Sequence, residues 1–413
     1  MLRIFNLTMI SVILFPISVL ANEALPSEDV HVAFIQDGNL WLWSEQGETQ
    51  ITKSGGVYDP QWSFDGEWIL YQKAIETEKR TDHNEIWVYN RKSGEHKKIF
   101  YNGRLPKWAP TQNLIAFQSE EVLNVSDLER FHNVALGVNG YTWLPDGSGF
   151  LLSSQADLVP IGWTNPKLYR KSLPENINKV EIFKDVKEFF TIPNELGIGD
   201  DTIWAITAGG LQFSPSGKWI SFVVSPTASM SMDTNMLSVI SSNGKRFEVL
   251  DEIIFEVGKP KWAPEKDMLA YIAGQGRIVF GFKDKNLKVK EMPVSESLTP
   301  KNYAELDFTW VDDNKIVTSR IEEREWSNNA KEHPLPALYS IQLEGNKQRR
   351  ITDPPEDYGD YAPQYLLNAQ KLIWFRQQSL TERNKDLWIG DANGKNAHVW
   401  LKNVEDVSVY EIK

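Results

Sequence analysis

Hydrophobic and polar residues alternate with a period of two in short runs along most of the chain. Residues 406–410 are an example, while runs such as 86–89 and 338–341 are apolar and aromatic, and the turns that follow these two runs are polar and contain Gly. Successive side chains of a strand point to opposite sides, so this period is typical of strands with one buried face. The pattern therefore predicts an all-β fold.

One sequence unit recurs along the chain. Each copy has an aromatic strand, a tight turn of the Pro-Asp-Gly kind and an apolar strand, in which Pro presets φ, Asp bonds its own backbone and Gly supplies positive φ. A second hairpin with a polar, Gly-bearing turn follows each copy, so the unit is one four-stranded antiparallel propeller blade. The seven copies span residues 59–71, 105–117, 141–152, 211–222, 259–271, 308–317 and 362–375.

The two ends of the chain complement each other. Residues 32–52 supply the second, third and fourth strands of a blade but no first strand, and residues 406–410 form a lone strand-like run. Pairing of these two segments would close the ring and remove sheet edges that invite aggregation. Counting this joint blade gives a β-propeller of about eight blades. Seven blades is the alternative, because the unit at 104–136 is short.

Tryptophan recurs at one position of the repeat. The chain has 16 Trp, which is many for its 413 residues, and aromatic residues favour strands. In a propeller the first strands line the channel, so these side chains are expected to fill the layers between blades. The tryptophans expected to be structural are Trp62, Trp108, Trp143, Trp262 and Trp310.

The repeat resembles the WD40-like PD40 repeat of TolB-type β-propellers. The best matches are residues 59–71, 105–117, 211–222 and 259–271, and the resemblance covers essentially the whole chain after residue 21. In that family the repeat occurs in periplasmic partner-binding proteins and in propellers attached to serine peptidases. The resemblance implies the fold, while eight units exceed the six blades usual for TolB itself.

The N-terminus has the features of a signal peptide. Arg3 is the only charged residue in the first 22, and an apolar run from Ile4 to Leu20 ends at Ala21. We therefore divide the chain into a signal peptide, 1–21, and one propeller domain, 22–413, exported to the periplasm, the cell surface or the medium. The mature chain is expected to lack a transmembrane span. An uncleaved N-terminal anchor is the alternative.

Composition narrows the chemistry. The chain has no Cys, which excludes disulfides, thiolate metal sites and a cysteine nucleophile. Its net charge of −12 gives no general attraction for phosphate backbones, so nucleic acid is not an expected partner. We expect a monomer that binds a protein, a peptide or a glycan.

Long connections are predicted to gather on one face of the propeller. They are second-to-third-strand or blade-to-blade connections, which emerge on the same face of antiparallel blades, and loops on a rigid scaffold often carry function. Segment 185–208 is taken as one of them, and the opposite face, with its tight turns, is expected to be bare. The candidate ligand-binding residues on the long-loop face are Trp163, Trp204, Trp326, Tyr358, Asp200, Asp201 and Arg324. Alternatively, these aromatic side chains cover their own loops and the acids are simply solvated.

No catalytic motif is recognisable, and no catalytic residue, metal ligand or cofactor is assigned. Asp146-Gly147-Ser148-Gly149 is a hairpin turn rather than a nucleophile elbow. Three functions remain open. The first is a non-catalytic binding propeller, the second a hydrolase or lyase with carboxylates, and possible Ca²⁺, in the central funnel, and the third a regulatory propeller for a separately encoded peptidase. A carboxylate pair with perturbed pKa values in the funnel would favour the second.

Cleavage after Ala21 is directly testable. N-terminal sequencing or the intact mass of exported protein is expected to show a chain that begins at Asn22, because residues of small or modest size, Val19 and Ala21, stand at the positions that signal peptidase reads. Membrane-bound protein that begins at Met1 would establish an anchor instead.

Overall fold

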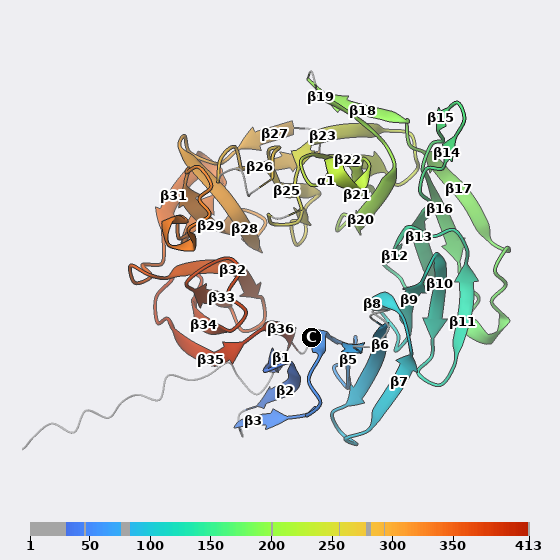
Figure 1. Cartoon of the computed structure of the whole chain (residues 1–413), viewed down its shortest axis with the longest axis horizontal. Coiled ribbons are helices and arrows are strands. Elements are labelled where there is room, and N and C mark those ends of the chain that lie inside the picture. Colours follow the sequence, from blue (N-terminus) through green and yellow to red (C-terminus); the bar gives the residue numbers. More distant parts are fainter. Residues whose placement is uncertain are drawn as a thin grey trace, which may run out of the picture.

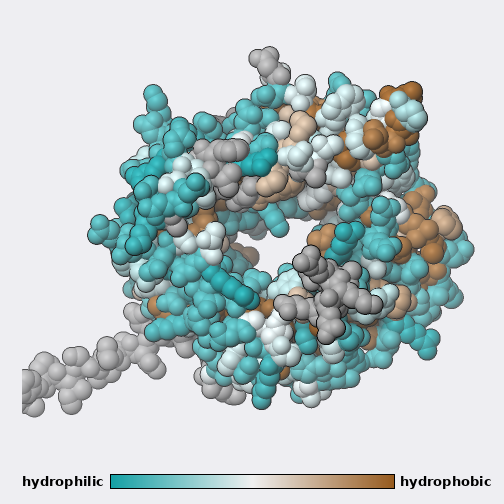
Figure 2. All heavy atoms as spheres, in the orientation of Figure 1, coloured by the Kyte–Doolittle hydropathy of each residue, from teal (hydrophilic) through white to brown (hydrophobic). Residues whose placement is uncertain are grey.

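A computed structural model describes residues 30–44, 47–75, 83–199, 201–255, 257–277, 282–292 and 294–411. Within these ranges, eight four-stranded antiparallel sheets form a ring (Figure 1). The opening through the centre of the ring is surrounded mainly by hydrophilic residues (Figure 2). The all-β propeller is confirmed, with eight blades and not seven. The predicted signal peptide lies outside the described residues.

The first four blades come from the two ends and the first half of the chain. Blade 1 joins β36 (Asp406–Glu411) to β1 (Val30–Gln36), β2 (Asn39–Ser44) and β3 (Gly47–Gln50). The next three blades are β4 (Val57–Trp62), β5 (Trp68–Ile75), β6 (His83–Asn90) and β7 (His96–Phe100); β8 (Arg104–Trp108), β9 (Ile115–Ser119), β10 (Val122–Ser126) and β11 (Phe131–Ala135); and β12 (Gly140–Trp143), β13 (Gly149–Ser153), β16 (Lys167–Ser172) and β17 (Val186–Thr191).

Blades 5 to 8 follow in chain order. They are β20 (Thr207–Phe213), β21 (Trp219–Ser225), β22 (Asn235–Ser241) and β23 (Phe247–Ile253); β24 (Lys261–Trp262), β25 (Met268–Ala273), β26 (Asn286–Glu291) and β27 (Val294–Ser297); β28 (Tyr303–Asp312), β29 (Lys315–Glu322), β30 (Ala337–Gln342) and β31 (Lys347–Arg350); and β32 (Gly359–Leu366), β33 (Lys371–Gln377), β34 (Lys385–Asp391) and β35 (His398–Val404).

The ring closes as the ends of the sequence predicted. Strand β36 pairs antiparallel with β1, with Val409 opposite Val32 and Asp406 opposite Ile35. The turn of blade 2 then packs on the closing strand, because a Cβ added to Gly66 would lie 2.2 Å from the Tyr410 ring. Gly66 also has a φ of 67°, so it serves both the turn and the close approach.

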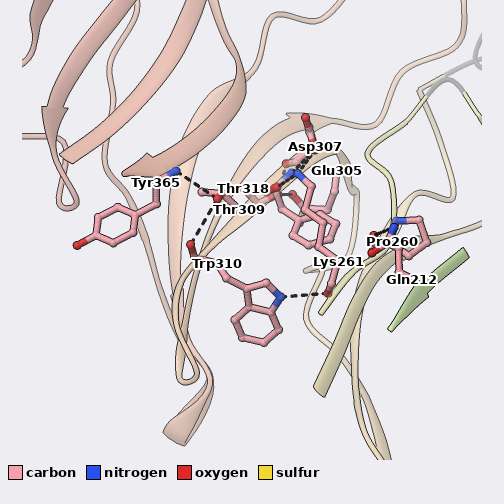
Figure 3. Close-up of polar contacts among 10 residues, drawn as sticks. Gln212, Pro260, Lys261, Glu305, Asp307, Thr309, Trp310, Thr318 and Tyr365 are labelled. Atoms are coloured by element: carbon pink, nitrogen blue, oxygen red, sulfur yellow. Dashed lines mark hydrogen bonds and ion pairs between the residues drawn. The ribbon is translucent and has the colours of Figure 1, made fainter. Parts of the chain in front are cut away.

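Indole groups tie the first strands of neighbouring blades together. Trp310 donates its indole N–H to the carbonyl oxygen of Lys261 at 3.1 Å, which lies one residue before the equivalent Trp262 of the preceding blade (Figure 3). The same kind of bond joins Trp62 to Ser408, Trp108 to Gln61 and Trp143 to Lys107, while the Trp262 indole reaches the Ser221 hydroxyl. The predicted place of these tryptophans between blades is confirmed.

The side chain just before the aromatic position makes a second hydrogen bond between first strands. It donates to the following blade, whereas the indole group donates to the preceding one. Gln212 donates its side-chain amide to the Pro260 carbonyl at 3.1 Å (Figure 3), and Gln61 does the same to Pro106 at 3.1 Å. Lysines occupy this position in two other blades, where Lys107 reaches Tyr141 and Lys261 reaches Phe308. Each acceptor lies two residues before the aromatic position of the next blade, so the two sets of bonds fix one register between first strands.

Tight turns on the face opposite the long loops are also used between blades. Asn113 of blade 3 donates to the Asp65 carboxylate of blade 2 at 2.7 Å, and the Ser216 hydroxyl of blade 5 donates to Asp267 of blade 6 at 2.6 Å. The acidic residues of these turns therefore have structural partners.

The expectation that this face is bare is wrong in one blade. Strand β17 lies inside the segment 185–208 that was taken as a connection, so residues 173–185, with the 3-10 helix η1 (Ile177–Lys179), join the third and fourth strands of blade 4 on the tight-turn face. Buried Lys171 holds this connection, because its ammonium donates to the carbonyl oxygens of Glu181 and Lys184.

Removal of one indole N–H is expected to weaken the ring. The variant Trp310→Phe keeps an aromatic ring but deprives the Lys261 carbonyl of its donor, which should lower the free energy of unfolding by about 1–3 kcal/mol. Denaturant titration measures this, with Trp204→Phe on the exposed surface as the matched control. Equal stability of the two variants would contradict a stabilising role for the inter-blade link.

Candidate functional site

The long connections lie together on one face of the propeller. They include the hairpin β14 (Leu158–Val159) and β15 (Gly162–Trp163), and the hairpin β18 (Glu195–Ile198) and β19 (Asp201–Trp204). The short helices α1 (Ala228–Ser231) and η3 (Ala330–Glu332) belong to second-to-third-strand connections of the same face. The gathering of long loops that the sequence predicted is therefore present.

Two adjoining cavities open at the channel on this face, and we call them together the funnel. They measure about 400 and 360 Å³ and share Val257, Gly258 and Lys259. Each lies within the range of small-ligand and peptide pockets, about 300–1,000 Å³. The charged lobe is the larger one and includes Lys261, Asp307, Tyr361, Phe375, Gln377, Leu380 and Lys385. The apolar lobe includes Gly209, Gly210, Val223, Ile253, Ile254, Phe255 and Pro260.

The funnel opens where one first strand is short. Strand β24 pairs with β25 only at Lys261 and Trp262, so residues 257–260 before it run outside the sheet. The amide of Gly258 instead donates to the Leu306 carbonyl of blade 7 at 2.7 Å. A Cβ at Gly258 would lie 2.6 Å from an Asp307 carboxylate oxygen, so only glycine permits this approach.

The apolar lobe exists because two residues of its wall lack side chains. A Cβ added to Gly209 would meet no atom within 4 Å, and Gly210 has a φ of 61°, which favours glycine. Val223 and Ile254 are buried behind this space, while Phe255 stands at the rim with 58% of its surface exposed. An apolar group of a ligand could enter here and remove water from these surfaces.

The charged lobe carries three lysines with different surroundings. The Lys261 ammonium is 2.9 Å from the Asp307 carboxylate (Figure 3). It also donates to the Phe308 carbonyl. Lys385 lies 4.6 Å from the centre of the Phe375 ring, and burial lowers the pKa of its amine. Lys259 has no hydrogen-bonded or ion-paired partner among the described residues. Lys385 likewise has no hydrogen-bonded or ion-paired partner in the described part of the chain, but it contacts the Phe375 ring, whereas Lys259 makes no such ring contact there.

Carboxylates line another part of the channel wall. One Asp59 oxygen accepts hydrogen bonds from the side chains of Gln61 and Gln72, each at 2.9 Å. Burial raises the pKa of Asp59, nearby Asp406 raises it further, and Lys259 opposes this rise. Burial also raises the pKa of Asp406. These two acids have the perturbed pKa values expected for the hydrolase or lyase hypothesis.

A bulge in the first strand gives Asp59 its place. Asp59 has a φ of 53°, and the register of β4 against β5 shifts between Tyr58 and Gln61. Leu105 and Ala362 have positive φ at the same position of their blades. Such a bulge changes the direction of a side chain, which brings this repeat position to the channel.

The structure distributes the sequence-predicted ligand residues over the long-loop face. Trp204 and Asp201 lie exposed on β19 and Trp163 is half-buried on β15. The bases of these two hairpins are joined by a hydrogen bond from the Ala156 amide to the Ile206 carbonyl. Asp200 lies outside the described residues.

The remaining candidates come from blades 7 and 8. Trp326 packs against Phe282, from the β25–β26 connection of blade 6, and against His333 of its own loop, with ring centres 5.6 and 4.2 Å apart, so it is partly buried between two loops. Arg324 donates to the Glu332 carbonyl in the same loop, and Tyr358 is 37% exposed. None of the described candidates lines the funnel.

The funnel residues were missed because they lie in the repeat itself. The segment Lys259-Pro260-Lys261-Trp262 matches the first-strand motif of the other blades. Its residue types therefore did not predict that only its last two residues pair with the next strand. Gly209-Gly210 was the available signal, since adjacent glycines in a strand mark a bulge or an approach by another group.

Two further properties concern the described part of the chain. No three of its His, Asp and Glu side chains are grouped so that they could hold a metal ion. None of its helices has the length and apolarity needed to cross a membrane.

Sequence comparison gives one distant relative. No protein-family model matches the chain. The chain is 26% identical over 117 residues to the uncharacterized peptidase YuxL of Bacillus subtilis (strain 168), a stretch that covers 25% of this chain and 18% of that protein. The match thus spans less than a fifth of the relative.

Solved structures support the fold. A eukaryotic initiation factor matches with a TM-score of 0.58 at 10% identity, covering 92% of this chain and 88% of the other. The dihydro-heme d1 dehydrogenase NirN matches with a TM-score of 0.58 at 10% identity, covering 94% and 76%. TolB from Acinetobacter baumannii is also similar, with a TM-score of 0.39 at 12% identity over 92% and 67%. The eight four-stranded sheets make the chain an eight-bladed β-propeller, and membership of the PD40 family stays a prediction.

The raised pKa of Asp59 has a testable consequence for stability. A folded-state pKa above the unfolded value of about 3.8 means that ionising Asp59 costs stability as pH rises through and above that value. The variant Asp59→Asn, which resembles the protonated acid, should therefore become more stable relative to the natural chain between pH 4 and pH 7. Urea titrations across this range measure the difference. A difference that stays constant or shrinks with rising pH would contradict a raised pKa.

Proposed function

We propose that this chain is a binding propeller that holds a peptide in the funnel of its long-loop face. The observation that carries the proposal is the funnel itself, in which an apolar lobe and a charged lobe meet at Val257, Gly258 and Lys259. Binding sites are commonly concave, mostly apolar and furnished with a few polar groups that orient the ligand. A peptide carries both apolar and charged groups along one chain, whereas a glycan has no large apolar side chain that could fill the apolar lobe beside Gly209.

The peptide is proposed to connect the chain with peptidase chemistry. Similarity to a stretch of an uncharacterized peptidase supports this connection, and it favours the regulatory propeller over a binder without any peptidase partner. In this role the propeller would bind a peptide while a separately encoded peptidase cleaves it. Export of the chain through its N-terminal segment is part of the same proposal and would place both proteins outside the cytoplasmic membrane.

A second candidate is a hydrolase or lyase that uses Asp59 and Asp406. The raised pKa values of these two acids favour it, because acid–base catalysis uses carboxyl groups whose pKa lies above the ordinary range. Against it, one Asp59 oxygen already accepts two amide hydrogen bonds. The binding role is therefore preferred.

A blocked lobe tests the binding role. The purified chain is incubated with a pool of synthetic hexapeptides, and native mass spectrometry reports which peptides remain bound. The natural chain should retain some peptides uncleaved. Gly209→Phe should lose at least about tenfold in affinity because its ring fills the apolar lobe, and Gly209→Ala should bind like the natural chain.

Thermal denaturation shows whether both variants remain folded. Phe255→Ala, at the exposed rim, provides a second variant that should weaken binding with little effect on folding. No retained peptide, or equal retention by Gly209→Phe, would refute the proposal. Cleaved peptides whose formation stops in Asp59→Asn would establish the hydrolase instead.

A further inference from the structure

The position of Lys259 distinguishes it from the other lysines of the channel. It lies at the junction of the two lobes, lines both of them, and has no hydrogen-bonded or ion-paired partner among the described residues. Lys107 donates to the Tyr141 carbonyl, and Lys261 is paired with Asp307. An ammonium group without a partner in a concave site is available to an anionic group of a ligand.

The surroundings make this point of the channel suited to an anion. Burial lowers the pKa of the Lys107 amine and the charge of Lys259 lowers it further, while the same charge opposes the rise of the Asp59 pKa. Lys385 adds a second positive charge within the charged lobe. The lining of the charged lobe contains three lysines and one acid, Asp307, which is paired with Lys261, so positive charge exceeds negative charge there.

An apolar space begins directly beside this ammonium group. Val257 and Pro260 flank Lys259 in the chain and line the apolar lobe together with Val223 and Gly209. A ligand with an anionic group at Lys259 can therefore place an attached apolar group in a cavity of about 360 Å³. An apolar group next to a carboxylate is the chemistry of the last residue of a peptide.

We infer that the funnel recognises the free carboxyl terminus of a peptide with an apolar last residue. The carboxylate binds the Lys259 ammonium, and the last side chain enters the apolar lobe. This inference rests on the proposed function and narrows it from peptides in general to one end of a peptide. A free aliphatic carboxylate shares the same two groups, so the experiment must separate the two sources.

Fluorescence anisotropy with labelled peptides tests the inference. The reference probe is a pentapeptide that ends in Phe with a free carboxyl group, and two matched probes end in Phe amide and in Asp. The natural chain should bind the free acid at least about tenfold more tightly than the amide, because the amide loses a charge-assisted hydrogen bond. The probe that ends in Asp should also bind more weakly, because its charged side chain must enter the apolar lobe.

Two lysine variants carry the same substitution on opposite faces of blade 6. Lys259→Met removes the ammonium but keeps an unbranched side chain, and it should weaken the free acid about tenfold while leaving the amide unchanged. Lys266→Met, in the tight turn between β24 and β25, should bind all probes like the natural chain. Equal binding of acid and amide, or an unchanged affinity in Lys259→Met, would overturn the inference.

Two outcomes separate this inference from the proposed function. If Gly209→Phe loses every peptide while acid and amide bind equally to the natural chain, the funnel binds peptides but does not read their carboxyl terminus. If no probe binds the natural chain, the proposed function itself fails. Octanoate that displaces the free acid with equal or higher affinity would assign the site to free aliphatic carboxylates and overturn the peptide terminus.

Discussion

The hydrogen bond between an indole group and a carbonyl of the preceding blade is the interaction on which the ring depends. For Trp108, Trp143 and Trp310 the acceptor lies one residue before the aromatic position of the preceding blade, so each of these bonds registers one first strand against the next. The bond from Trp62 to Ser408 extends this register across the joint between the two ends of the chain. Because buried backbone groups need partners, a blade cannot rotate without loss of these bonds. The blades therefore hold the channel wall in one geometry.

The first strands of the other blades form a regular channel wall, so the one blade with a short first strand leaves a cavity in it. On the tight-turn face, acids such as Asp65 and Asp267 bind neighbouring blades, which leaves them occupied. On the long-loop face, β24 is reduced to two residues, and the chain before it turns toward blade 7 through Gly258. The funnel lies at this departure from the repeat. Its rigidity comes from the seven other blades, which is how loops on a stable scaffold acquire a defined ligand site.

Local signals made the fold predictable. Three signals predicted the eight blades and the pairing of the two chain ends: the period of two, the Pro-Asp-Gly turns and the missing first strand at the N-terminus. Each of these signals lies within a short segment of the sequence. The long-loop face was predicted from connection lengths, but the funnel was not, since Lys259 and Lys261 read like their counterparts in other blades. Whether Trp326 is exposed depends on Phe282, which is distant in sequence. The connection after Lys171 was missed because it lacks a glycine turn and is held by a buried lysine.

Exchange of the indole N–H protons tests the inter-blade links most directly. Nitrogen-15 labelling of tryptophan allows their exchange with solvent to be followed by NMR in the full chain and in a chain that lacks residues 406–413. If closure holds the ring, the five linking indole groups exchange slowly in the full chain and lose protection together in the shortened one. Loss of protection at Trp62 alone would show that each link stands by itself and would contradict the account. The groups to follow are Trp62, Trp108, Trp143, Trp262 and Trp310.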